Sequence, residues 1–319
     1  MQPIAILLAA CNGQKYIRQM LVSLQNQTCA DFICYIHDDG SKDETPEILR
    51  EFCQRDPGHF CQLEGPVQGG AKENFLWMLG QVEAQVYMFA DQDDVWLPDK
   101  IEKSLAALFE ADAGKGESAG EKLCVFTDMY VTDEQLRVTD ASFIRHIGRD
   151  PFATRFSQVV IDNPAAGCSM MFTRRLRDMA LQLKDPGRVE MHDVWLLSVA
   201  AACGQERVGV LDEPLVYYRQ HADNEKGASA DGFCGKIKRN LLELFSGKMA
   251  GSKRAFIRSA RDLAGQVCQV NGIDPGAKET LREFSRIGEK SKLGRIAFYR
   301  RHGFTRGSRA QTLWMYFWV

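Results

Sequence analysis

The chain has 319 residues, of which 45% are hydrophobic and 26% are charged, and its formal net charge is −2. This composition is typical of a globular protein that can bury a full core, and it excludes disordered and fibrous classes. No stretch approaches the roughly 20 apolar residues that a membrane-spanning helix needs. The ten cysteines form no CxxC pair, which argues against a structural zinc site and favours a reducing compartment, so we expect a cytoplasmic protein.

The first 111 residues alternate between apolar runs and amphipathic stretches, the pattern of βαβ units in a parallel sheet. The continuous apolar run at residues 3–10 is typical of a strand that is buried on both faces. The expected strands are residues 3–10, 31–37 and 86–90, and the expected helices are residues 16–27, 45–54, 74–80 and 98–111.

A short polar segment follows each of these strands. The segments are Asn12-Gly13, Asp38-Asp39-Gly40-Ser41 and Asp91-Gln92-Asp93-Asp94. Ligands of open α/β sheets bind at the carboxyl ends of the strands. We therefore expect these three segments to share one edge of the sheet and to form a site there.

The second half of the chain is predicted to be mixed α/β and to end in helices. Residues 112–121 are polar and rich in glycine, which marks a loop or boundary. The expected strands are residues 123–127, 167–173, 208–211 and 215–219, and the expected helix is residues 192–203. From residue 233 onward the pattern is amphipathic and helical. We therefore divide the chain into residues 1–111, 112–232 and 233–319.

The charge is distributed unevenly between these parts. Residues 1–232 carry a net charge of −14, whereas residues 233–319 carry +12. Such a split indicates that an acidic part of the chain carries the function and that a basic part binds another molecule or surface.

The most informative motif is the acidic segment after the strand at 86–90. Asp91, Asp93 and Asp94 place three carboxylates within four residues, and two like charges about 5 Å apart repel by roughly 3 kcal/mol at an effective dielectric of 20. A divalent cation such as Mg²⁺ or Mn²⁺ would relieve this repulsion, with substrate phosphates completing its coordination. The alternative is an acidic turn before a helix.

Three further segments carry candidate side chains, each with a structural alternative. Asp38-Asp39 forms an ordinary turn, or one of its carboxylates accepts a hydrogen bond from a nucleobase N–H or a ribose hydroxyl. Lys72 and Asn74 form a turn into a helix or face a diphosphate. Asp193, beside His192, is a helix cap or a general base that takes a proton from an acceptor hydroxyl. His221 is a lone histidine after a strand, and such residues are more often structural than metal-ligating.

Taken together and in this order, the motifs resemble glycosyltransferase family 2. The resemblance covers about residues 3–224, and the last 95 or so residues have no counterpart in it. The motifs most similar to bacterial rhamnosyltransferase-type members are Asp91-Gln92-Asp93-Asp94-Val95-Trp96, Gly167-Cys168-Ser169-Met170-Met171-Phe172, His192-Asp193 and Tyr218-Arg219-Gln220-His221.

This resemblance implies a GT-A fold, that is, a Rossmann-like, mostly parallel sheet flanked by helices, here with a helical C-terminal appendage. It also implies an inverting transfer from a nucleotide-diphosphate-sugar, with Mn²⁺ or Mg²⁺ as cofactor. The donor expected first is dTDP-rhamnose and second a UDP-hexose. The acceptor expected is a saccharide or lipid-linked saccharide of cell-surface polysaccharide synthesis.

The motifs, together with this resemblance, give the full set of candidate site residues. Asp193 is the catalytic base, and Asp93 with His221 holds the metal. The acceptor side is assigned to Trp96, His192 and Trp195. The nucleotide-sugar is assigned to Ala10, Asn12, Asp38, Asp39, Lys72, Asn74, Asp91 and Gln92.

One departure from the family pattern affects the nucleobase. Members of the family often carry Thr-Tyr-Asn after the first strand, whereas this chain has Ala10-Cys11-Asn12. The tyrosine that would lie near the base is therefore missing, and the resemblance leaves the base open.

The basic end of the chain has two interpretations. Residues 233–319 combine apolar helical positions and many Lys and Arg with the aromatic end Leu313-Trp314-Met315-Tyr316-Phe317-Trp318. Such helices can lie on an anionic membrane surface, here the inner face of the cell membrane, or pack on the catalytic domain or a second subunit. We find no nucleic-acid-binding motif and expect no such partner.

Two other functions are compatible with parts of the sequence. A nucleotide-sugar-binding module without catalysis would bind a donor but show no transfer dependent on Asp193. A Mg²⁺-dependent phosphatase of the haloacid dehalogenase type also uses an Asp-x-Asp pair at a strand end, but that pair lies on the first strand.

Overall fold

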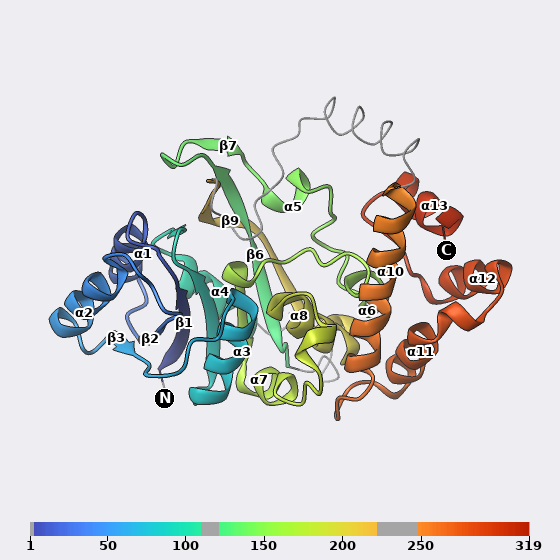
Figure 1. Cartoon of the computed structure of the whole chain (residues 1–319), viewed down its shortest axis with the longest axis horizontal. Coiled ribbons are helices and arrows are strands. Elements are labelled where there is room, and N and C mark those ends of the chain that lie inside the picture. The colour runs from blue at the N-terminus through green and yellow to red at the C-terminus, as the bar shows by residue number, and fades with distance from the viewer. Residues whose placement is uncertain (1–2, 110–120, 222–247, 319) are drawn as a thin grey trace.

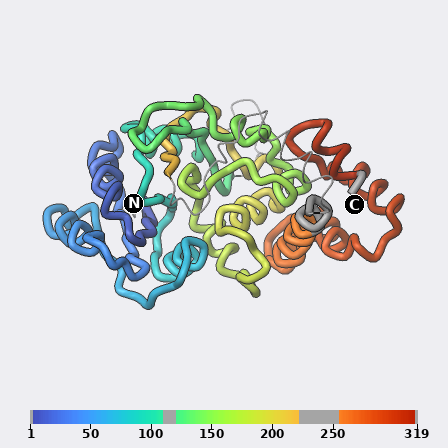
Figure 2. The backbone as a smooth tube through the Cα atoms, turned by 45° about the horizontal axis from the view of Figure 1, so that its top comes forward, coloured from blue at the N-terminus to red at the C-terminus, as the bar shows by residue number. Residues whose placement is uncertain are grey.

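The computed structural model describes residues 3–109, 121–221 and 248–318, together with the side chains of all of these except residues 248–254 and 317–318. Its described strands form one mixed sheet in the order β3-β2-β1-β4-β8-β6-β9-β5, with β7 paired to β6. Helices flank the sheet (Figure 1). The N-terminal part and the C-terminal helices lie at opposite ends, with the middle of the chain between them (Figure 2).

The first half of the chain forms the parallel part of the sheet, as expected. Its strands are β1 (Ile4–Ala10), β2 (Phe32–Asp38), β3 (Phe60–Gln62) and β4 (Val86–Asp91). Its helices are α1 (Ile17–Gln25), α2 (Thr45–Arg55), α3 (Ala71–Gln81) and α4 (Lys100–Phe109). The strands β3, β2, β1 and β4 pair in parallel, in that order.

Strand β1 is apolar throughout because both of its faces are covered. Its alternate residues Ala5 and Leu7 belong to one core cluster, with α3 and the later helix α8 (His192–Ala202). The residues between them belong to a second cluster, which includes residues of α1, α2 and α4. Side chains alternate between the faces of a strand, so a strand between two helical layers has no polar position.

The register of the parallel strands brings the polar segments together. Ala10 of β1 pairs with Asp38 of β2, and Ala9 pairs with Asp91 of β4. The segments that begin at residues 11, 38 and 91 therefore leave the sheet side by side. This confirms the predicted convergence of the strand ends.

The second half adds antiparallel pairs to the sheet. Its strands are β5 (Val95–Trp96), β6 (Cys124–Thr132), β7 (Val138–Asp140), β8 (Met170–Thr173) and β9 (Val208–Arg219). Strand β8 runs antiparallel to both β4 and β6. The two strands expected at 208–211 and 215–219 form one strand, β9, whose pairing with β6 shifts register before Pro214. The strand expected to begin at Gly167 begins at Met170, after a short 3₁₀ turn, η1 (Gly167–Ser169).

Smaller helices connect these strands in the second half of the chain. They are α5 (Phe143–His146), α6 (Phe156–Val159) and α7 (Arg174–Ala180), with short 3₁₀ turns η2 (Pro186–Arg188) and η3 (Gln205–Arg207) around α8.

The C-terminal helices share the core of the sheet domain. They are α10 (Lys248–Val267), α11 (Pro275–Ser285), α12 (Lys292–His302) and α13 (Arg309–Trp318), with η4 (Ile287–Glu289) between α11 and α12. Ala264, Val267 and Phe284 are fully buried and belong to the same cluster as α8. Of the two interpretations of this region, packing on the rest of the chain is therefore the one that the described helices display. None of the described helices is both long and apolar enough to cross a membrane.

We predict that replacing Phe284 with alanine destabilises the whole chain. Its ring is fully buried and stacks on Phe304 at a centroid distance of 4.5 Å. Removing a buried phenylalanine side chain costs about 3–5 kcal/mol. Urea unfolding of Phe284→Ala measures this loss, and Leu293→Ala, at a side chain that is 80% exposed, is the matched control. A loss below about 1 kcal/mol would contradict a core shared by the two parts.

Candidate active site

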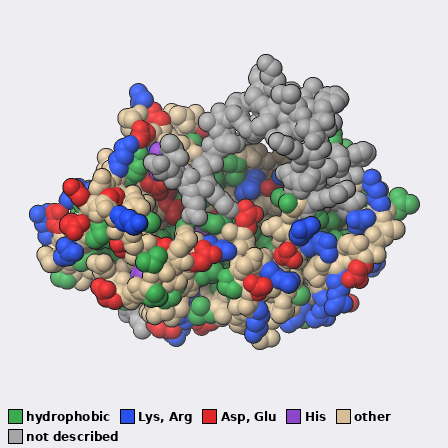
Figure 3. Space-filling model, viewed as in Figure 1, with side chains coloured by type: hydrophobic (Ala, Val, Ile, Leu, Met, Phe, Trp, Pro, Cys, Tyr) green, Lys and Arg blue, Asp and Glu red, His purple; other side chains and the backbone are tan. Residues whose placement is uncertain are grey.

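A cleft of about 1040 Å³ lies at the carboxyl ends of β1 and β4 and extends to α8 and α10. Figure 3 shows this face of the molecule hollowed between its two ends. Ten of the fourteen predicted site residues line the cleft. They are Ala10, Asn12, Asp39, Asn74, Asp91, Gln92, Asp93, His192, Asp193 and His221.

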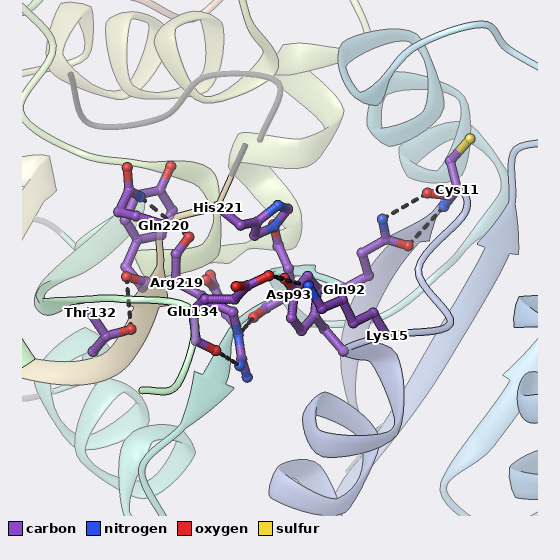
Figure 4. A network of polar contacts seen from close by, with 12 residues as sticks. Cys11, Lys15, Gln92, Asp93, Thr132, Glu134, Arg219, Gln220 and His221 are labelled. Atoms are coloured by element: carbon purple, nitrogen blue, oxygen red, sulfur yellow. Dashed lines mark hydrogen bonds and ion pairs between the residues drawn. The ribbon is translucent and has the colours of Figure 1, made fainter. Parts of the chain in front are cut away.

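The amide of Gln92 fixes the backbone at the end of β1. Its Oε1 accepts from the N–H of Cys11 at 2.9 Å, and its Nε2 donates to the Cys11 carbonyl at 2.8 Å. A Cβ at Gly13 would lie 2.1 Å from Gln92 Oε1, so a larger residue at this position would displace the amide from its contacts with Cys11. Gln92 therefore shapes the floor of the cleft, through contacts that join the ends of β1 and β4 (Figure 4).

Asp39, rather than Asp38, is the acidic residue of the second strand end that lines the cleft. Its carboxylate accepts the backbone N–H groups of Gln68, Gly69 (2.9 Å) and Gly70 (3.0 Å). Asp38 instead accepts from Ser41 within its own turn. Asp39 thus holds the loop that leads into α3 against the end of β2.

Lys72 and Asn74, two residues apart on α3, have different surroundings. Asn74 is buried, lines the cleft and contacts His37 Nδ1 through its Oδ1 at 2.8 Å. The Lys72 ammonium donates to the carbonyls of Pro186 and Val189, at 3.1 and 3.2 Å. The structure therefore corrects the expectation that Lys72 faces a diphosphate: its side chain ties α3 to the segment before α8.

The predicted metal ligands meet from two distant segments. Asp93 Oδ2 lies 2.8 Å from His221 Nε2, although the residues are 128 positions apart, and both line the cleft. Figure 4 shows the carboxylate and the imidazole facing each other. A carboxylate and an imidazole that open on a cleft are a donor set that Mn²⁺ accepts.

Arg219 positions both of these residues. Its Nε donates to the Asp93 carbonyl at 2.8 Å, and its backbone N–H donates to Asp94 Oδ1 at 3.2 Å. Its guanidinium also lies over the ring of Tyr16, 4.6 Å from the centroid. Tyr16 in turn packs against His221, with a distance of 4.7 Å between ring centroids.

A glutamate from the β6–β7 hairpin connects to the same group. The Tyr16 hydroxyl donates to Glu134 Oε1 at 2.6 Å, and the Lys15 ammonium also contacts this carboxylate. The hydrogen bond from Lys15 holds the pKa of Glu134 below its usual value. Lys15 and Tyr16 both line the cleft, and sequence reasoning missed them.

Next to the metal-binding candidates lies a second acidic group, of which only Asp91 lines the cleft. Oxygen atoms of Asp91 and Asp94 and the sulfur of Cys168 lie within 4.8 Å of one another. Asp94 and Cys168 are fully buried, and burial raises the pKa of both groups well above their ordinary values. A diphosphate cannot reach these two side chains, so we assign the substrate metal to the cleft-lining pair instead.

Lys100 is the buried cation near this group. Its Nζ has no hydrogen-bond partner among the described residues and lies 3.8 Å from the centroid of the Trp96 ring. Burial lowers the pKa of Lys100 to about 7. The amine of Lys100 is therefore partly protonated near pH 7, and it lies close to the acidic turn that contains Asp94.

Asp193 lines the same cleft as the metal candidates and lies in the first turn of α8. Its Oδ1 accepts the N–H of Val194 at 2.6 Å. The neighbouring His192 is buried between Phe75 and Phe89, at ring centroid distances of 4.3 and 4.7 Å. The backbone at α8 therefore fixes the place of the Asp193 carboxylate.

Two predicted acceptor-side residues lie in the core instead. Trp195 is fully buried and donates from Nε1 to the Ala180 carbonyl at 3.0 Å. Trp96 is 2% exposed, and its backbone N–H donates to Ser23. Neither lines the cleft, because α8 turns Trp195 toward α7 and the short strand β5 turns Trp96 toward α1.

Comparison with known proteins finds similar sequences and similar folds. Residues 5–122 match the family model described as glycosyl transferase family 2. The dTDP-rhamnosyl transferase RfbG of Shigella flexneri is 26% identical over 243 residues, which are 73% of this chain and 77% of that protein.

Solved structures are similar in fold at low sequence identity. TarS of S. aureus, residues 1–349 in complex with UDP, aligns over 91% of this chain and 73% of that chain, with a TM-score of 0.56 and 15% identity. The mannosyltransferase PcManGT of Pyrobaculum calidifontis, in complex with GDP-Man and Mn²⁺, aligns over 99% and 84%, with a TM-score of 0.52 and 12% identity.

We predict that Lys100 makes stability depend on pH. The folded chain releases the Lys100 proton near pH 7, whereas an unfolded chain keeps it to about pH 10.4. The unfolded state therefore binds more protons between these values, so the free energy of unfolding rises with pH, by at most about 1.4 kcal/mol per unit. Urea unfolding at pH 7, 8 and 9 measures the difference between wild type and Lys100→Met.

The wild type should gain stability relative to Lys100→Met at each step toward higher pH. Lys42→Met, at an exposed position, is the matched control for the loss of a lysine. A constant difference between wild type and Lys100→Met across this range would show that the buried amine keeps its ordinary proton affinity.

Proposed function

The chain is a glycosyltransferase with a family 2 domain, and we propose that it transfers a sugar from a nucleotide-diphosphate-sugar to a saccharide or lipid-linked saccharide, with inversion at the anomeric carbon. The observation that carries this proposal is the arrangement of the cleft. The Asp93–His221 pair lies at the ends of β4 and β9, and Asp193 lies on α8. All three line one space, so a leaving group and an attacking hydroxyl have separate partners.

The donor half of the cleft is proposed to hold the nucleotide. Asp39, Asn74 and the backbone around Cys11 and Gln92 lie there, next to Asp91. The similarity to a dTDP-rhamnosyl transferase makes dTDP-rhamnose the first donor to test. A UDP-hexose is the second, since TarS is solved with UDP.

A divalent cation fits the pair of residues that faces the diphosphate position. Asp93 and His221 would hold Mn²⁺ or Mg²⁺, as their carboxylate and imidazole already face each other at 2.8 Å. When bound, the cation neutralises the negative charge that the departing diphosphate gains. The mannosyltransferase of similar fold was solved with Mn²⁺.

The chemical step follows from the remaining residues. The acceptor oxygen forms a bond to the anomeric carbon while the bond from that carbon to the diphosphate oxygen breaks. The Asp193 carboxylate takes the hydroxyl proton, and the nucleoside diphosphate leaves with the bonding electrons. Because attack and departure occur on opposite faces, one displacement inverts the configuration.

The parts of the chain are assigned roles on the same basis. Residues 1–111 hold the donor, residues 112–232 supply the acceptor side and Asp193, and residues 233–319 form a basic helical region. We place the protein in the cytoplasm, with peripheral contact to the inner face of the membrane. Exposed Leu313 and Trp314 on α13, next to many Arg residues, are the anchors proposed for that contact.

We predict that Asp193→Asn removes turnover without removing the donor. A missing general base lowers kcat by on the order of 10²–10⁴, because the amide cannot accept the hydroxyl proton. Steady-state transfer from dTDP-rhamnose or a UDP-hexose, with nucleotide affinity measured by calorimetry, separates the two effects. Asp31→Asn, at an exposed aspartate outside the cleft, is the matched control. Wild-type kcat in Asp193→Asn would refute the assigned role.

We also predict that Asp93→Ala weakens nucleotide binding only in the presence of the metal. Loss of one cation-binding carboxylate should cost on the order of 10–100-fold in affinity for a nucleoside diphosphate in Mn²⁺. In EDTA, wild type and variant should bind equally. Titration calorimetry in both buffers checks this, and equal affinities in Mn²⁺ would remove Asp93 from the cation site.

A further inference from the structure

We infer that Lys15 binds the diphosphate of the donor as a second cation beside the metal, and that it leaves the Glu134 carboxylate in order to do so. The inference rests on the proposed function and adds a further binding residue to that site. It is carried by the charges that line the cleft, by the bonded state of the backbone around Lys15 and by a second hydrogen-bond partner of Glu134.

The strand ends of the cleft carry an excess of negative charge. Asp39, Asp91 and Asp93 line this part, and a divalent cation bound there is partly neutralised by its own carboxylate ligand. A nucleotide diphosphate has an ionised phosphate on each side of its bridging oxygen, and it gains further negative charge as it leaves. A single divalent cation therefore leaves part of the charge of the diphosphate without a counter-ion.

Of the described residues that line the cleft, Lys15 and Arg149 carry a lysine or arginine charge. Arg149 is held by Asp162, at 3.0 Å from its Nε. Lys72, which the sequence analysis placed at the diphosphate, donates to two backbone carbonyls instead. Lys15 is therefore the described lysine that remains for the diphosphate.

Lys15 lies near the proposed metal ligands. Its Nζ is 5.1 Å from the centroid of the Tyr16 ring. The imidazole of His221 packs against the same ring, at a centroid distance of 4.7 Å. The ammonium group and one of the two proposed metal ligands thus share a neighbour, and Figure 4 shows the Lys15 side chain in the group that contains Asp93 and His221.

The backbone before Lys15 already has its hydrogen bonds. The N–H groups of residues 12–14 each donate to a side chain of the segment 41–45. In chain order the acceptors are Ser41 Oγ at 2.7 Å, Thr45 Oγ1 at 2.8 Å and Asp43 Oδ2 at 3.1 Å. A phosphate at this end of the cleft therefore meets the side chain of Lys15 rather than these backbone donors.

Glu134 holds Lys15 without burying it. The ammonium group contacts Glu134 Oε1, and the two side chains are 64% and 39% exposed. The hydrogen bond to Glu134 raises the pKa of Lys15, so the amine is charged at neutral pH. An ion pair between exposed partners adds little stability, and the four-carbon stem of lysine is flexible. The ammonium group is therefore able to move to a more strongly charged phosphate.

Glu134 keeps its place when Lys15 leaves. Its Oε1 also accepts from the Tyr16 hydroxyl at 2.6 Å, and its backbone carbonyl accepts from Arg219 Nη1 at 2.6 Å. The carboxylate is thus still hydrogen-bonded after the exchange. Because Glu134 and the diphosphate compete for one ammonium group, removing the lysine and removing the glutamate should have opposite effects on donor binding.

Two single variants and their combination test this exchange, by calorimetry on the full-length protein. Lys15→Met should weaken dTDP or UDP, whichever the wild type binds, about tenfold, because a hydrogen bond to a charged group is lost. The affinity for thymidine or uridine should not change. The loss should persist in EDTA, unlike that of Asp93→Ala, because the lysine acts without the metal. Glu134→Gln should tighten the diphosphate about two- to fivefold, and should add nothing to Lys15→Met.

Controls separate this exchange from a general effect of charge. Lys15→Arg keeps the charge and should retain most of the affinity. Lys290→Met and Glu283→Gln each break an exposed ion pair of 2.8 Å that lies outside the cleft, and should leave the affinity unchanged. Wild-type affinity of Lys15→Met for the diphosphate, or weaker binding by Glu134→Gln, overturns the inference while the donor site stands. Failure of the wild type to bind any nucleoside diphosphate with Mn²⁺ would instead overturn the proposed function.

Discussion

One buried guanidinium joins the pieces on which the site depends. Arg219, at the end of β9, donates to the carbonyls of Asp93 and Glu134 and to the side chain of Gln19. It therefore connects the acidic turn after β4, the β6–β7 hairpin and α1, and it is only 3% exposed. His221 follows two residues later and meets Asp93 because Arg219 has already fixed both backbones. The carboxylates of the turn after β4 repel one another, and Arg219 both fixes the backbone of this turn and places a positive charge next to it.

The C-terminal helices are part of the same construction. Their buried side chains belong to the core cluster that contains α3 and α8, the backbone N–H of Asp274 donates to the Ala202 carbonyl at 2.9 Å, and α10 forms a wall of the cleft. A deletion of residues 233–319 would consequently expose a large apolar surface, so point substitutions are the informative way to study this region. Its positive charge balances the acidic part of the chain, and its Arg306 donates to Asp162 at 3.4 Å.

The sequence predicted the parallel part of the fold and most of the side chains that line the cleft at its strand ends, because both follow local rules. Apolar runs ended by Asn12-Gly13, Asp38-Asp39 and Asp91 to Asp94 reveal strands and their carboxyl ends. The tryptophans were misassigned because a motif position does not specify on which side of an element a side chain lies: Trp195 and Trp96 face the core. Lys72 was misassigned because its partners, the carbonyls of Pro186 and Val189, lie far away in the sequence. The short strands β3, β5 and β7 and the cleft wall from α10 depend on tertiary contacts that no local pattern contains.

The central claim is that the Asp93–His221 end of the cleft binds a nucleoside diphosphate together with a divalent cation. Thermal unfolding of the wild type with UDP, dTDP, GDP and CMP, each in Mn²⁺, Mg²⁺ or EDTA, tests it most directly. A ligand at 100 times its Kd adds about 2.7 kcal/mol to the free energy of unfolding. The account predicts a raised Tm for one nucleoside diphosphate that disappears in EDTA, and this also identifies the base. An unchanged Tm with every nucleotide, in every buffer, would contradict it.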